Sequence, residues 1–452
     1  MIFGILFSYF LIGIFSLRRL INNSEVTILP SHVFFFIVFI SGLMNFILFI
    51  NTDFILEIFS EELSRRHTSA FLIRNCKYHF CNNLDQSFFL EVHVFCIIFL
   101  LAMSLVFFRK NYIKSLRLNL IDLVEQKKGE KNNLRKLLLI FLIMVLLSPI
   151  KIKYPFFHDA GLLLFNLIII LWVSQTNELR NTLIRFVISL FLLFIILVVY
   201  PYFLYSLMYE GEVPIQRGSF VNHALVLFMF SYFHMTYKLK NSLRMLLYFF
   251  LSILISVLCL DLLQDLSSFF EHTWFEKIFR SLYVFEHTIF RNAAVALDSL
   301  QISNAYLHGE TYINAFYALI PFTGIERGLS HSVIVMYENL LWAKMNGGMA
   351  SGFIVEGALN FGIYLGAIST SLIISIFFLV VDHLYSIHKK SILHFLLAIY
   401  SISLIYAVFR YDLAILFRKI EYGLVLVIII YLVYFLVSKI EVRLNKNKND
   451  KF

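Results

Sequence analysis

The sequence predicts an all-α polytopic integral membrane protein with about eleven transmembrane helices (roughly 10–12). Composition and hydropathy together predict this class. Hydrophobic residues make up 60% of the 452-residue chain and charged residues 15%, against about 45–50% and about 25% in typical proteins. The mean hydropathy is +0.80. So few charges do not cover the surface of a soluble protein of this size, which excludes a cytosolic enzyme, a disordered chain and a disulfide scaffold.

Apolar runs without Lys or Arg, long enough to cross a hydrocarbon core of about 30 Å, define the expected helices. The run at 137–150 is short and borrows Lys151 and Lys153 as snorkelling ends. The run at 352–382 exceeds one span, so it is either a tilted helix or begins with a partly buried re-entrant piece. In order, the runs cover 2–17, 31–50, 89–108, 137–150, 156–174, 186–207, 219–237, 245–260, 352–382, 392–409 and 421–438.

The distribution of basic residues predicts the orientation. One set of connecting segments holds 23 of the 38 Lys and Arg residues in about 76 residues, and the other set holds 15 in about 156. The richer side is expected to be cytoplasmic, which places the N-terminus outside and the C-terminus in the cytoplasm. Arg18 and Arg19 follow the first apolar run and no basic residue precedes it, so this run is expected to be a first span, not a cleaved signal peptide.

Four regions follow from this pattern. We expect an N-terminal bundle of about eight helices (1–260), a large outer loop (261–351), about three C-terminal transmembrane helices (352–438) and a basic cytoplasmic tail (439–452). The outer loop is too long for a simple connection. Its aromatic residues recur at helical spacing, which predicts helices lying at the membrane–water boundary.

The sequence gives no sign of nucleic-acid binding or of a zinc site. The net charge of +9 arises from basic residues between apolar runs, so no nucleic-acid partner is expected. The four cysteines form no zinc signature, and no metal or cofactor is expected. Cys76 and Cys81 lie in a polar loop, where they either pair, if the loop faces an oxidising compartment, or remain free thiols.

The informative stretch runs from 291 to 366. It contains an arginine after an aromatic segment, then G-x-T-Y at 309–312, and later E-x-x-x-N-F-G-x-x-x-G at 356–366. Together with many spans and a large outer loop in the second half, this pattern resembles the Wzy-type polymerases, which join oligosaccharide repeat units of O-antigen or capsule in the bacterial inner membrane. The resemblance covers the whole chain in topology but only about 290–412 in residues.

The resemblance implies a GT-C-like fold and a metal-independent glycosyltransferase acting on the periplasmic side of the inner membrane. Donor and acceptor would both be oligosaccharides linked to undecaprenyl pyrophosphate. The acceptor hydroxyl would attack the reducing-end sugar of the donor, and the lipid pyrophosphate would leave. Besides these substrates and the bilayer, the family usually works with a polysaccharide chain-length regulator.

Arginines are the natural partners for a leaving pyrophosphate, because their planar fork pairs bidentately with phosphate oxygens. Arg291 lies at the family-like position before G-x-T-Y, Arg327 lies between two glycines, and Arg410 begins an R-Y-D sequence at the outer end of a span. We therefore predict Arg291, Arg327 and Arg410 as pyrophosphate ligands. The alternative is that they anchor lipid headgroups.

Glu356 is the first candidate for a catalytic base. An ionised acid inside a span costs about 2.5–3.5 kcal/mol, so it is expected to face protein or a wet cavity. On a helix, Glu356 and Asn360 share one face. The alternatives are that Glu356 orients an arginine or only stabilises a helix start. His331, in the outer loop, is a rival candidate for the base.

Asp412, Asn360 and Tyr312 are predicted to support this site, Asp412 by pairing with an arginine. Two other functions remain open. An O-antigen ligase shares the topology but transfers the glycan to a lipid A core. A flippase for lipid-linked oligosaccharides would need more evenly spaced spans and shorter outer loops than this chain has.

Overall fold

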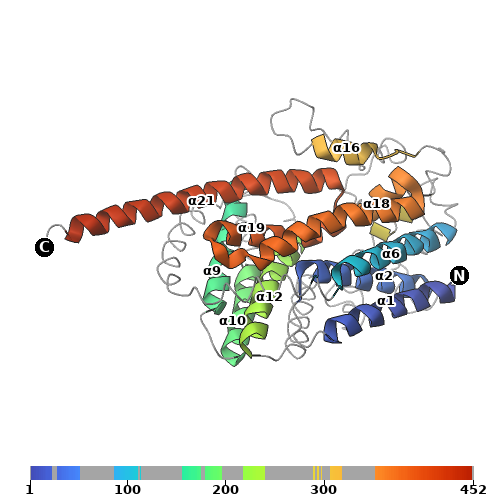
Figure 1. Ribbon diagram of the computed structural model, residues 1–452, viewed down its shortest axis with the longest axis horizontal. Helices are drawn as coiled ribbons and strands as arrows, with labels where there is room; N and C mark the ends of the chain where they lie inside the picture. Colours follow the sequence, from blue (N-terminus) through green and yellow to red (C-terminus); the bar gives the residue numbers. More distant parts are fainter. Residues whose placement is uncertain are drawn as a thin grey trace, which may run out of the picture.

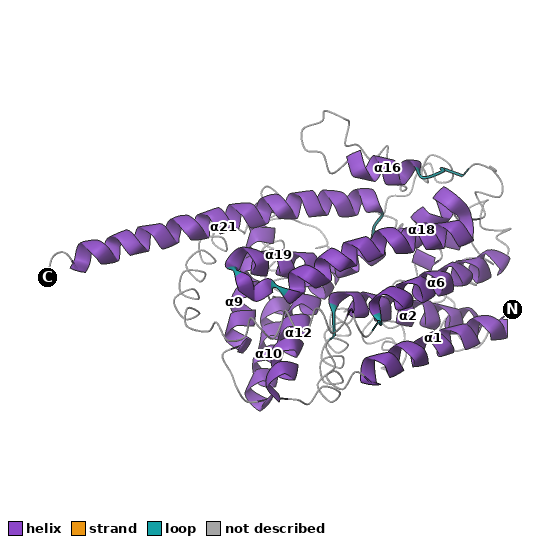
Figure 2. Cartoon of the chain, viewed as in Figure 1, coloured by secondary structure: helices purple, strands orange, loops and turns teal. Residues whose placement is uncertain are grey.

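The computed structural model describes residues 2–22, 28–50, 86–109, 112, 155–174, 179–195, 217–239, 289–290, 293–294, 297, 306–317 and 352–449. Within these ranges the regular structure is helical throughout, joined by short turns (Figure 2). The described part is therefore an α-helical assembly of long apolar segments, as the composition predicts. The predicted helices at 137–150 and 245–260, and most of the outer loop at 261–351, lie outside the described residues.

Figure 1 shows how the helices are arranged. The helices are α1 (Ile2–Asn22), α2 (Pro30–Ile50), α6 (Gln86–Phe107), α9 (Pro155–Ser174), α10 (Leu179–Phe194), α12 (Arg217–Leu239), α16 (Glu310–Tyr317), α18 (Gly352–Ser386), the 3₁₀ turn η5 (His388–Lys390), α19 (Ile392–Ser403), α20 (Ile405–Arg410) and α21 (Leu413–Asn449). The last helix begins at Leu413, earlier than the predicted run at 421–438. The prediction missed its first turns because Arg418 and Lys419 interrupt the apolar sequence there.

Six of the described helical segments are long and apolar enough to cross a membrane. They are Ile2–Arg19, Pro30–Ile47, Ser87–Phe107, Gly352–Ser386, Ile392–Arg410 and Leu413–Lys439. Helices α9, α10 and α12 contain shorter apolar stretches. The predicted total of about eleven spans and the GT-C-like arrangement stay predictions.

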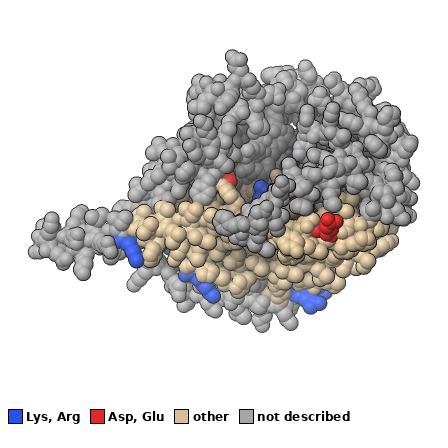
Figure 3. Space-filling view, turned by 90° about the horizontal axis from the view of Figure 1, so that it is seen from above, with Lys and Arg blue, Asp and Glu red and all other residues tan. Residues whose placement is uncertain are grey.

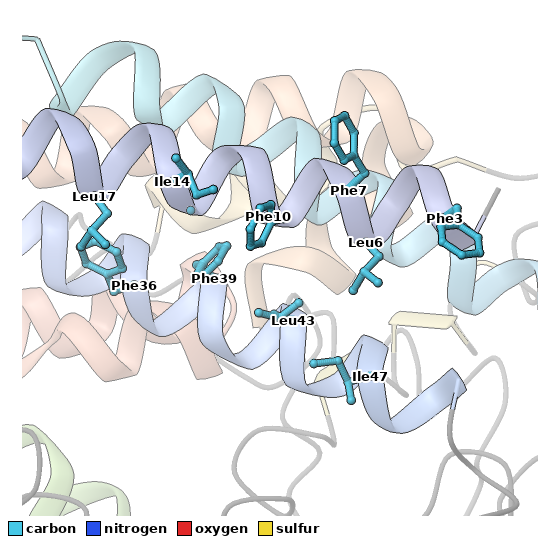
Figure 4. A pocket seen from close by; sticks show the side chains of 11 residues that line it. Phe3, Leu6, Phe7, Phe10, Ile14, Leu17, Phe36, Phe39, Leu43 and Ile47 are labelled. Atoms are coloured by element: carbon cyan, nitrogen blue, oxygen red, sulfur yellow. The ribbon is translucent and has the colours of Figure 1, made fainter.

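The surface of the described part suits a bilayer. Figure 3 shows a broad tan area with charged side chains at only a few isolated positions. Between α1 and α2 lies a groove of about 650 Å³ whose lining includes Phe10, Phe39 and Leu43, which point into it (Figure 4). All of its lining side chains are apolar. This composition matches lipid acyl chains.

Ring contacts give the relative direction of α2 and α6. Phe46, near the end of α2, packs on His93, near the start of α6, with ring centroids 4.9 Å apart. Phe34, near the start of α2, packs on Phe99, further along α6, at 6.3 Å. The two helices therefore run antiparallel.

The later part of helix α18, which contains Ser375 and Asp382, runs parallel to α6. The Ser375 hydroxyl donates to Met103 Sδ at 3.2 Å, and further along both segments the Tyr112 hydroxyl donates to Asp382 Oδ2 at 2.8 Å. Asp382 is fully buried and also accepts from the backbone N–H and the hydroxyl of Ser31 at the start of α2. Burial and the Asp382 carboxylate raise the pKa of Tyr112, so its hydroxyl keeps the proton that it donates.

These directions match the alternation predicted from the basic residues, in which the helix at 31–50 runs opposite to those at 89–108 and 352–382. The packing relates the helices only to one another. Which end faces the periplasm stays a prediction.

Helix α18 is a hairpin of two helices. Gly362 has φ 71° and ψ −162°, outside helical geometry. A Cβ added at Gly357 would meet the Thr370 hydroxyl, and one added at Gly366 would meet the carbonyl of Gly357. Thirteen residues of straight helix would separate Gly357 from Thr370 by about 20 Å. The segment 352–361 therefore folds back on 363–386, which is the shape of the re-entrant alternative, and we call 352–361 the re-entrant helix.

Replacing Gly366 by Val is expected to force the two arms of this hairpin apart, because the Gly357 carbonyl occupies the space that the new side chain needs. Overpacking of this kind costs about 1–3 kcal/mol. Thermal unfolding of the purified protein in detergent should show a lower Tm. The matched control is Gly4→Val in α1, where a Cβ meets nothing within 4 Å. Equal Tm values for the two variants would contradict the hairpin packing.

Candidate active site

The two sequence patterns at 309–312 and 356–366 meet in space, and Asn360 joins them. Asn360 is fully buried. Its Oδ1 accepts from the backbone N–H of Gly309 at 3.0 Å, and its Nδ2 donates to Thr311 Oγ1 at 2.6 Å and to the carbonyl of Glu356 at 2.8 Å. One amide side chain thereby ties the start of α16 to the re-entrant helix. The supporting role predicted for Asn360 stays a prediction.

The segment 306–309 closes the end of the re-entrant helix. The N–H of Leu307 donates to the carbonyl of Leu359, and the N–H of His308 donates to the carbonyl of Asn360, both at 3.1 Å. His308 and Gly309 have positive φ values of 46° and 89°, which lets the chain turn directly from these bonds into α16. Carbonyls that a helix end would leave unsatisfied are thus bonded within the protein.

Tyr312 fixes α16 against the second arm of the hairpin. Its hydroxyl is hydrogen-bonded to Thr370 Oγ1 at 2.7 Å, and its ring lies 5.9 Å from that of Phe361. Burial, followed by the nearby Glu356 carboxylate, raises the pKa of Tyr312. The phenol therefore stays protonated, and the supporting role predicted for Tyr312 would be that of a neutral group.

Glu356 lies where three elements meet. It is 1% exposed. Its Oε2 accepts from the backbone N–H of Leu413, the first residue of α21, at 2.8 Å. The hydroxyl of Thr311 on α16 and the carboxylate of Asp412 both lie close enough to interact with it. The carboxylate is thus oriented by the re-entrant helix, α16 and the start of α21.

Asp412 caps α21. Its Oδ1 accepts from the N–H of Ile415 at 2.8 Å, which is the usual bond of an N-cap aspartate. Asp412 is fully buried and follows Arg410, the partly buried last residue of α20, by two positions. Arg410, Tyr411 and Asp412 therefore form the tip of a hairpin between α20 and α21, and this tip lies against the re-entrant helix.

The depth of the site follows from the hairpin. Gly357, next to Glu356, packs on Thr370, which precedes the end of α18 at Ser386 by sixteen residues. At 1.5 Å per residue, this places Glu356 about 24 Å from that end. Since a hydrocarbon core is about 30 Å thick, the site lies toward the opposite margin of the core.

Two buried carboxylates at one helix start exceed what capping requires. One N-cap side chain satisfies the first turn of α21, and Asp412 supplies it. A second carboxylate from another helix adds a buried negative charge beside the first, which is costly unless a cation or a proton compensates it. Paired acids in such surroundings are characteristic of functional sites.

The structure brings together Glu356, Asn360, Tyr312 and Asp412, with Arg410 at the neighbouring hairpin tip. The predicted ligands Arg291 and Arg327, and the alternative base His331, lie outside the described residues, so their roles stay predictions. Sequence reasoning did not assign a role to Thr311 or to the backbone N–H of Leu413. Thr311 was visible within the G-x-T-Y pattern, but its contact with Glu356 bridges 45 residues.

Comparisons of the chain with protein-family models, with curated proteins and with solved structures found no match. Within the described ranges, no three His, Cys, Asp or Glu side chains gather closely enough to hold a metal ion. The fold and the site together define an α-helical membrane protein with a re-entrant helix that carries a buried acid. Any narrower assignment rests on the chemistry of the site.

Proposed function

We propose that this protein is an inner-membrane polymerase that joins undecaprenyl-pyrophosphate-linked oligosaccharide repeat units into a surface polysaccharide. The observation that carries the proposal is the meeting of Glu356 with Asp412 at the hairpin tip that Arg410 begins. Glycosyl transfer from a lipid pyrophosphate needs a base for the acceptor and positive charge for the leaving group. Carboxylate and guanidinium are the side chains that supply these.

The proposed reaction is one substitution at the anomeric carbon. Glu356 accepts the proton of the acceptor hydroxyl as its oxygen bonds to C1 of the donor sugar. The bond between C1 and the pyrophosphate oxygen breaks, and its electron pair leaves with the lipid pyrophosphate. Arg410, with Arg291 and Arg327 from the outer loop, neutralises the charge on that leaving group.

Within this proposal, Asp412 holds the tip of the α20–α21 hairpin, in which Arg410 lies three residues before Leu413, the partner of Glu356. Asn360 and Tyr312 keep the re-entrant helix and α16 together. The location of Glu356 toward one margin of the membrane core supports the proposal. A polyprenyl tail stays in the bilayer, while its pyrophosphate lies at the interface.

Transport of the same lipid-linked oligosaccharide is the second candidate. Broken helices inside the bundle also occur in transporters, where they surround the substrate. The large outer loop predicted from the sequence favours the polymerase.

Deletion of the gene in the native bacterium, followed by gel electrophoresis of its surface glycans, tests the proposal. The polymerase predicts that the long-chain ladder collapses to a single repeat unit and that a plasmid copy restores it. Polymer that accumulates on the carrier lipid instead would indicate a ligase. Single carrier-linked repeats that accumulate on the cytoplasmic face would indicate a flippase. Either of these results would overturn the proposal.

A further inference from the structure

Thr311 lies between the two groups that hold the site together. It is 1% exposed and belongs to the first turn of α16. Its hydroxyl oxygen accepts the hydrogen bond from Asn360 Nδ2 at 2.6 Å. The same hydroxyl lies next to the Glu356 carboxylate.

The amide of Asn360 determines how this hydroxyl is used. An amide nitrogen only donates, so Thr311 Oγ1 is the acceptor in that bond, and its own proton remains available to another acceptor. Glu356 Oε1 lies nearby, is buried and accepts no hydrogen bond from the described residues, so it is the acceptor open to this proton. On the other side of the carboxylate, Oε2 is occupied by the N–H of Leu413.

We propose that Thr311 is a positioning residue whose hydroxyl, oriented by Asn360, donates to Glu356 and holds its carboxylate in the conformation that accepts the proton of the acceptor sugar. This inference rests on the proposed function. The donors come from two elements, α16 and α21, so the carboxylate is fixed only while both pack on the re-entrant helix.

The test compares Thr311→Val with Thr311→Ser. Val matches the shape of Thr but lacks the hydroxyl, whereas Ser keeps the hydroxyl and lacks the methyl group. Each variant is purified, reconstituted into vesicles and assayed for chain growth with the lipid-linked repeat unit of the native bacterium. We expect Thr311→Val to lower kcat by about 10- to 100-fold with little change in KM, and Thr311→Ser to stay within about threefold of the wild type.

A role in packing alone would affect both variants alike, and loss of the Asn360 bond alone would lower the amount of folded protein, not kcat. Equal losses in Thr311→Val and Thr311→Ser would therefore overturn the inference, as would wild-type kcat in Thr311→Val. If Thr311→Val does not accumulate in the membrane, Thr311→Ala, which introduces no new methyl group, replaces it with the same expectation for kcat.

Glu356→Gln separates this inference from the proposed function. If Glu356→Gln is inactive while Thr311→Val has wild-type kcat, the positioning role is wrong and the polymerase proposal stands. If Glu356→Gln itself polymerises at the wild-type rate, Glu356 is no base and both the positioning role and the proposed mechanism fail.

Discussion

Glu356→Gln is expected to abolish chain growth while leaving the protein folded. The Gln side chain keeps an oxygen that accepts from the N–H of Leu413, so the start of α21 retains this bond. It has no carboxylate to take a proton. Loss of a general base typically costs 10²–10⁴-fold in rate, so the long-chain ladder should be replaced by single repeats.

The measurement is complementation of the deletion strain, with the glycan ladder on gels and the protein level on immunoblots. Glu310→Gln is the matched control, because Glu310 is an exposed acid at the start of α16, close in sequence to Thr311. We expect the control to restore a normal ladder. A normal ladder from Glu356→Gln would assign Glu356 to the support of α21 alone.

Arg410→Ala is expected to give the second largest loss. Hydrogen bonds between charged groups contribute about 1.5–3 kcal/mol, which corresponds to about 10- to 100-fold in rate. Arg410→Lys should restore only part of the lost rate, because an ammonium does not form the bidentate pair that a guanidinium forms with phosphate. The readout is the rate of chain growth in reconstituted vesicles at saturating acceptor.

Arg18→Ala is the control for Arg410→Ala. Arg18 is an exposed arginine near the C-terminal end of α1, far along the chain from the site. Both variants remove one positive charge from the protein, so a general effect of charge would affect both equally. Similar rates in the two variants would show that Arg410 does not bind the pyrophosphate, and the alternative that it anchors lipid headgroups would then hold.

Part of the candidate site could be predicted from the sequence. Glu356 and Asn360 share a helix face by spacing alone, and an acid in an apolar run is conspicuous because burying it is expensive. The contact between the G-x-T-Y segment and this helix face could not be predicted. Gly309 and Asn360 are 51 residues apart, and no local periodicity relates the two segments. For the same reason Thr311 received no role before its contacts with Asn360 and Glu356 were seen.

The amino-acid sequence by itself determined that this is a multi-pass helical membrane protein, because long apolar runs have to satisfy their backbone hydrogen bonds internally in lipid. It also predicted the alternating helix directions, because basic residues collect on one side. Only the tertiary structure decided that the run from 352 is a hairpin. Hydropathy is the same for a tilted helix and for two shorter ones. The choice depends on the turn at Gly362 and on the close contact between Gly357 and Gly366. That fold brings Glu356 to the start of α21.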